Sequence, residues 1–117
     1  MQYVSDMLIA LQKASPAQSF LIRAHVGNYS LFLAGIFHET VQNRSQRGGP
    51  NVSFYEEVGR TNYRVAAGHQ VARSCALTEI YETLAASFRD VRLALNELSE
   101  TLMHLDSSHA PRMPLLS

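Results

Sequence analysis

Apolar residues recur along this chain at spacings of three and four, which is the pattern of an amphipathic helix, and no stretch alternates convincingly as a β-strand does. Four segments carry the helical pattern, at about residues 3–14, 16–44, 53–73 and 77–105. We therefore expect an all-α protein, a helical bundle of about four helices with a long C-terminal heptad helix.

Two capping boxes and one loop separate these segments. Ser15 and Gln18 stand where a capping box belongs, and Ser53 and Glu56 form a second such pair. Between the second and third segments, residues 45–51 contain Gly-Gly-Pro, which is a strong loop signal. The third helix is therefore expected to open at Ser53.

The second segment is apolar around most of its circumference, which indicates a central helix. Gly27 and Gly35 lie inside it, where each costs about 1 kcal/mol relative to Ala. Such glycines permit a close crossing of two helices, and Gly27 is alternatively a break. The sequence leaves both interpretations open.

The last segment has the most regular pattern in the chain. Positions alternately four and three residues apart lie along one face of a helix, and we call this row the seam. All nine seam positions are apolar: Leu77, Tyr81, Leu84, Phe88, Val91, Leu95, Leu98, Leu102 and Leu105. This predicts one helix of roughly 43 Å. The positions beside the seam are mostly small or uncharged, whereas a two-stranded coiled coil usually places Glu and Lys there. We therefore interpret the segment as a bundle helix with a neighbouring helix on each shoulder, that is, at the positions on either side of the seam.

The lengths of the segments suggest a second copy of the chain. The first helix is too short to cover two long ones, so some apolar surface needs another cover, which favours a homodimer. Leu93 and Met103 lie on the otherwise polar face of the last helix and are candidate contact residues.

Length and the chain ends define the expected domain. A chain of 117 residues indicates one domain. We expect residues 1–106 to form a single helical domain and residues 107–117 an extended or flexible tail. Because an apolar helical face starts as early as residue 3, we also expect that the chain is cut from a longer protein.

Composition excludes several classes of protein. Hydrophobic residues make up 46% of the chain and charged residues 17%, with a formal net charge of zero, which argues against disorder and makes a nucleic-acid partner an unfavoured alternative. The single Cys75 rules out an intrachain disulfide and fits a reducing compartment. The longest apolar run, residues 29–37, is shorter than the ~20 residues of a membrane span, and the N-terminus lacks a signal-peptide pattern. We expect a cytoplasmic protein without membrane contact.

Arginine supplies almost all of the positive charge. Arg44 and Arg47 flank the predicted loop, and Arg60 and Arg64 lie one turn apart on one helix face. Because arginine suits bidentate pairing at interfaces, these four are candidate interaction residues. The segment 77–106 has an acidic excess, so ion pairs to it are favoured over a patch that binds phosphate or nucleic acid.

A few polar residues offer acid–base chemistry. His38 and Glu39 begin a sequence that resembles the zinc-protease helix signature, but Gln42 stands where the second His is needed, so no metal site and no cofactor are expected. The candidate catalytic residues are His38, Glu39, Glu56 and His69, and a ligand pocket would add His25 and Tyr63.

These observations favour a non-catalytic, cytoplasmic module for protein–protein interaction or oligomerisation. The first alternative is a small helical-bundle enzyme, or a binder of a small molecule or metal, that uses the His and Glu residues above. The second is a weak nucleic-acid binder that uses an arginine patch.

Overall fold

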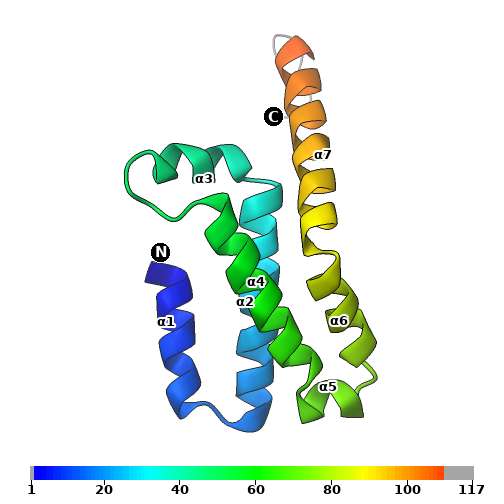
Figure 1. Ribbon diagram of the computed structural model, residues 1–117. Helices are drawn as coiled ribbons and strands as arrows, with labels where there is room; N and C mark the ends of the chain where they lie inside the picture. Colours follow the sequence, from blue (N-terminus) through cyan, green and yellow to red (C-terminus); the bar gives the residue numbers. More distant parts are fainter. Residues whose placement is uncertain (1, 110–117) are drawn as a thin grey trace.

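The computed structural model describes the backbone of residues 2–109 and the side chains of residues 3–105. Every regular element in that part of the chain is helical, which confirms the all-α prediction (Figure 1). The elements are α1 (Gln2–Ala10), the 3-10 turn η1 (Leu11–Lys13), α2 (Pro16–Gly35), α3 (His38–Ser45), α4 (Val52–Ala67), α5 (Gln70–Ser74), α6 (Thr78–Ala86) and α7 (Phe88–His109).

Each long helix predicted from the sequence is divided in the structure. The segment 16–44 breaks at Ile36 and Phe37, the segment 53–73 breaks at Gly68 and His69, and the heptad segment breaks at Ser87. The prediction of one continuous heptad helix is therefore wrong. The apolar period continues across Ser87, but the backbone leaves helical geometry there, at φ −98° and ψ 12°.

The C-terminal boundary also differs from the prediction. The tail was expected to start at residue 107, but α7 continues to His109. Residues 110–117, the rest of the predicted tail, lie outside the described residues.

α2 and α4 cross at the centre of the molecule, and the other helices lie beside this pair (Figure 1). α6 and α7 run along one side, and α1 packs on α2 from the other side. Three apolar clusters fill the spaces between the helices: Tyr63, Ala85 and Phe88 at the α6–α7 junction, Phe20, Ala66 and Ala72 near α5, and Ala34, Val41 and Tyr55 near α3.

Three glycines set the distance between the central helices. A Cβ atom at each would lie far inside van der Waals contact with a ring or side chain of a neighbouring helix. The three contacts are Gly27 with Tyr63, at 2.6 Å, Gly35 with Leu95, at 2.7 Å, and Gly59 with Phe88, at 2.4 Å. Gly27 therefore permits a close crossing and does not break α2.

The bend between α2 and α3 is held by side chains of α7. At the end of a helix the last carbonyl groups lack backbone donors. The Asn96 amide donates to the carbonyls of Ala34, at 2.9 Å, and Gly35, at 2.6 Å. The Ser99 hydroxyl donates to the carbonyl of Ile36, at 3.0 Å. These bonds satisfy the end of α2 and allow the chain to turn.

Within the described residues, no single helix is long and apolar enough to cross a bilayer. α2 and α3 reach that length and hydropathy only when taken together, and their axes differ by 84°.

We expect Gly59→Ala to lower the free energy of unfolding by about 1–3 kcal/mol, because the added methyl group overlaps the Phe88 ring. Gly68→Ala is the matched control, since its nearest neighbours would lie 3.8 Å away, at ordinary contact distance. Urea unfolding followed by circular dichroism measures both. Equal stability of the two variants would contradict the close approach of α4 and α7.

We expect Asn96→Ala to cost about 1–3 kcal/mol of unfolding free energy, because it removes the amide donor from two buried carbonyl groups. Asn43→Ala, at an exposed position of α3, is the control and should change stability little. The same urea titration reports both values. An Asn96→Ala protein as stable as the control would show that the Asn96 amide does not hold the bend.

Candidate functional site

The most concentrated charge cluster in the described structure surrounds Glu56 of α4. This carboxylate is buried, with 7% of the residue exposed, and three guanidinium groups approach it. Arg89 Nη2 donates to Oε2 at 2.8 Å, Arg92 Nε donates to Oε1 at 3.0 Å, and Arg60 Nη2 lies 3.8 Å from Oε2. The cluster therefore connects α4 to the first two turns of α7.

Glu56 is available for this cluster because it does not cap α4. The sequence predicted a capping box formed by Ser53 and Glu56, and this prediction is wrong. The N-cap is Asn51, two residues before Ser53, and the Asn51 side chain accepts a hydrogen bond from the Phe54 amide at 2.9 Å. Glu56 therefore lies one turn into α4 and turns toward α7.

The electrostatics of the cluster keep Glu56 charged. Burial by itself raises the pKa of this carboxyl, but hydrogen bonds from Arg89 and Arg92, and the charges of both, outweigh burial and lower the pKa below its ordinary value. The same hydrogen bond and the charge of Glu56 raise the pKa of Arg89. The Glu56 carboxylate and the Arg89 guanidinium thus remain ionised at neutral pH.

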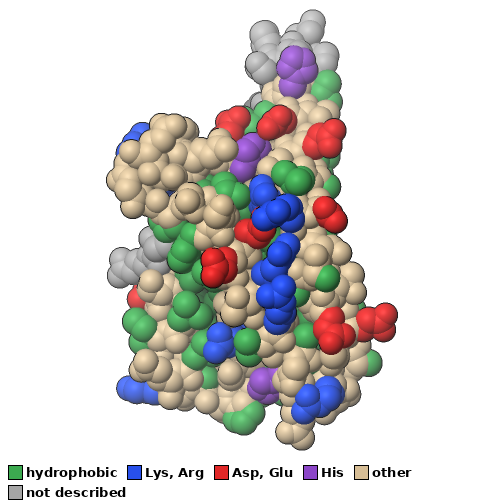
Figure 2. Space-filling model, in the orientation of Figure 1, with side chains coloured by type: hydrophobic (Ala, Val, Ile, Leu, Met, Phe, Trp, Pro, Cys, Tyr) green, Lys and Arg blue, Asp and Glu red, His purple; other side chains and the backbone are tan. Residues whose placement is uncertain are grey.

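A surface pocket of about 360 Å³ opens over this cluster, and we call it the arginine pocket. Its lining residues are Ser53, Glu56, Glu57, Arg60, Arg64 and Arg89. Figure 2 shows the basic side chains as a column between α4 and the α6–α7 pair. Ser53, Arg60 and Arg64 come from one face of α4, and α7 supplies the opposite wall.

The predicted ion pairs with the acidic last segment are not what the structure shows. The shared acid is Glu56 of α4, and the last segment supplies two arginines to it. In the part of the chain that is described, no ion pair involves Arg44, Arg47 or Arg64. Arg44 and Arg47 are exposed at the end of α3 and beyond it, and neither lines the arginine pocket.

His38 and Glu39 lie at the start of α3. His38 is buried, with Nδ1 at 3.2 Å from the Gly35 carbonyl and Nε2 at 3.2 Å from Glu100 of α7. Glu39 is exposed, and both residues line a second pocket between the α2–α3 bend and α7. His38 therefore joins the bend to α7, in the same way as Asn96.

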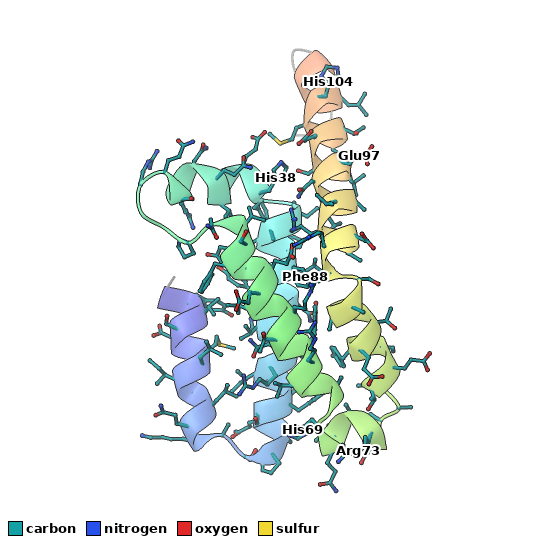
Figure 3. All side chains as sticks on the ribbon, viewed as in Figure 1. His38, His69, Arg73, Phe88, Glu97 and His104 are labelled. Atoms are coloured by element: carbon teal, nitrogen blue, oxygen red, sulfur yellow. The ribbon has the colours of Figure 1, made fainter. Side chains whose placement is uncertain are left out.

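The remaining candidates lie elsewhere. His69 lies near α5 at the lower end of the molecule, far below His38 (Figure 3), and its Nδ1 accepts from the Val71 amide and caps α5. His25 receives a hydrogen bond from the Tyr3 hydroxyl across a distance of 2.6 Å when its Nε2 is the acceptor. Tyr63 is buried, and burial raises its pKa far above the ordinary value.

The structure thus separates the four catalytic candidates. His38 and Glu39 share one pocket, Glu56 lines another, and His69 is a helix cap. Among the residues searched, those whose structure is described, no group of three or more His, Cys, Asp or Glu side chains is arranged to hold a metal ion. No common acid–base site is therefore assembled from these residues.

The second half of α7 has an apolar stripe that the described chain does not cover, formed by Leu98, Leu102 and Leu105. These side chains are 49%, 55% and 49% exposed, whereas Phe88, which belongs to the same seam at the start of α7, is fully buried. We call the three leucines the uncovered stripe. The periodicity of the sequence correctly predicts that these leucines share one face of the helix. It also predicts that the bundle buries them, whereas they are half exposed.

Leu93 and Met103, the contact candidates from the sequence, are both about half exposed. Met103 lines the second pocket together with Leu102 and Phe37, and this pocket measures about 370 Å³. Phe37 itself is 45% exposed and packs edge-on against Phe32. The uncovered stripe therefore continues into an apolar groove beside the α2–α3 bend.

We expect Glu56→Gln to lower the free energy of unfolding by about 2 kcal/mol at pH 7, because it removes the charge that pairs with Arg89 and Arg92. Since the folded pKa of Glu56 is depressed, this contribution is complete above the unfolded pKa near 4.5 and is lost as the pH falls through the folded pKa. The stability difference between wild type and Glu56→Gln should therefore shrink in acid.

Glu57→Gln is the matched control, because Glu57 is the exposed neighbour and no ion pair to it is formed in the described structure. Urea titrations from neutral to acidic pH give the unfolding free energies. A Glu56→Gln penalty that is absent at pH 7, or that is the same at every pH, would refute the role of the charged cluster.

Comparison of the chain with protein-family models, with curated proteins and with solved structures finds no match. The inferences on function therefore rest on two features of the molecule itself. These are the arginine pocket around Glu56 and the uncovered stripe of α7.

Proposed function

We propose that this chain is a non-catalytic, cytoplasmic interaction module that forms a homodimer through the uncovered stripe of α7. The observation that carries the proposal is the change in burial along one heptad seam. Phe88 is buried by the chain's own helices, whereas Leu98, Leu102 and Leu105 are half exposed. A seam of this type is stabilised when a second helix packs against it.

The heptad spacing favours a second copy of the same helix as the occupant. Leu95, Leu98, Leu102 and Leu105 alternate at spacings of three and four, which is the repeat by which like helices interlock their side chains. The stripe of one copy is therefore complementary in spacing to the stripe of another.

The shoulders of the seam also favour self-association. Arg92 and Ser99 lie on the shoulder that faces the chain's own helices, where both are at least partly buried. Ala94 and Thr101 lie on the other shoulder and are exposed. Because neither is charged, a second copy can approach without like charges meeting on this side of the seam.

Other features support a binding module over an enzyme. The acid–base candidates His38, Glu56 and His69 each make a structural contact and lie apart. The lone Cys75 is exposed and free, which is compatible with a reducing cytoplasm. The apolar groove at Phe37 and Met103 extends the proposed contact surface.

We expect sedimentation equilibrium to show a dimer at about 10–100 µM, the range in which a modest interface forms. The double variant Leu98→Glu with Leu102→Glu should raise the dimer dissociation constant by about 100-fold, because two carboxylates would enter an apolar contact. Circular dichroism of the variant should show unchanged helix content, since both side chains are already half exposed.

Leu93→Glu is the matched control on the same helix. Leu93 is 48% exposed, as much as Leu98, but lies about 140° away around the helix at 100° per residue. Its substitution should leave the dimer intact. A wild-type chain that is monomeric at about 100 µM would overturn the proposal. A dimer weakened by Leu93→Glu and not by the double variant would place the contact on the other face.

A further inference from the structure

We propose that the arginine pocket is a binding site for a phosphate group, either free or as a monoester. The proposal goes beyond dimer formation and uses a different surface of the molecule. It rests on the surplus of guanidinium groups around one buried carboxylate, on the unused donors among them, and on the pocket that exposes them.

The pocket and its surroundings hold more positive than negative charge. Four guanidinium groups and three carboxylates lie in or beside the pocket, which leaves one uncompensated positive charge. The seven residues are Arg60, Arg64, Arg89, Arg92, Glu56, Glu57 and Asp90. One carboxylate, Glu56, is already shared among three of the arginines, and Glu57 is exposed at the rim. A phosphate group would compensate this surplus.

Two arginines of the pocket have donors that no described carboxylate engages. Arg60 Nε is buried and has no partner in the described structure, although a buried donor without an acceptor is costly. Arg64 is exposed, lines the pocket and forms no ion pair with any described residue. These two side chains are one turn apart on α4, so both can approach the same anion.

The walls of the pocket consist largely of hydrogen-bond donors. Donors face the pocket from two helices, with Arg60 and Arg64 on α4 and Arg89 on α7, and the Ser53 hydroxyl adds a neutral donor. A phosphate group has several oxygen atoms that accept hydrogen bonds from different directions, and guanidinium groups match this geometry. The fixed pairs of Glu56 with Arg89 and Arg92 hold part of the wall in place before any ligand arrives.

A phosphate group fits these observations better than a nucleic acid does. The chain has a net charge of zero, whereas a nucleic-acid surface needs a basic excess along an extended face. Here the surplus is confined to one pocket, and Arg44 and Arg47 lie outside it. The volume of about 360 Å³ suits a small anion or a phosphorylated side chain.

The test is a titration of the ¹⁵N-labelled full chain, in phosphate-free buffer, followed by the arginine Nε–Hε signals in NMR spectra. The three probes are inorganic phosphate, pyrophosphate and a capped phosphoserine. We expect saturable shifts of a few arginine signals, and a roughly tenfold loss of affinity in Arg64→Gln, which removes one charged donor. A preference for capped phosphoserine would identify a modified side chain as the source, and a preference for the inorganic ions a free phosphate.

Arg47→Gln is the control, because Arg47 is exposed outside the pocket and should not affect binding. Arg64→Glu is a second variant that should abolish binding, since it reverses the charge without touching the partners of Glu56. Circular dichroism checks that both variants fold. The proposal is overturned if no probe gives saturable shifts, or if Arg64→Gln binds as tightly as Arg47→Gln. Neither result would bear on the dimer proposed through α7.

Discussion

The close approach of α2, α4 and α7 is the constraint on which the rest of the structure depends. Each pair of these helices meets at a glycine, so the backbones come nearer than larger side chains would allow. Only at this separation do the short side chains of Asn96 and Ser99 reach the end of α2. The same approach brings α7 close enough for its arginines to pair with Glu56. Packing and charge pairing are therefore consequences of one geometric condition.

Much of the helical character could be predicted from the sequence, but the breaks could not. Apolar periodicity identified every helical segment, and the capping box at Ser15 and Gln18 is present in the structure. Periodicity reports which residues face one side, and a break of one or two residues hardly changes it. The break after Gly35 depends on donors from Asn96, 61 residues away in the chain, and no local pattern encodes such a partner.

The sequence predicts some residues of the arginine pocket but not that they come together. Glu56 is a catalytic candidate from the sequence and Arg60 and Arg64 are interaction candidates, but the local pattern places Glu56 in a capping box and favours ion pairs of the arginines with the acidic last segment. Arg89 and Arg92 are not predicted as site residues, because acidic residues outnumber basic ones in their segment. The net charge of a segment does not indicate which of its side chains face the other helices. A signal was present, since a carboxylate one turn before Arg60 on the same face predicts a contact within α4. The pairing of Glu56 with Arg89 and Arg92 of α7 can be recognised only from the folded structure.

The capping of α2 by α7 has a consequence for how the chain is made. Asn96 and Ser99 are synthesised more than 60 residues after the carbonyl groups that they satisfy. During synthesis α2 and α4 leave the ribosome before α7 does, so water must satisfy the end of α2 until α7 follows. The bend and the docking of α7 are therefore completed in one step, later than the emergence of α2 and α4. Until that step, the carbonyl groups that end α2 stay hydrated.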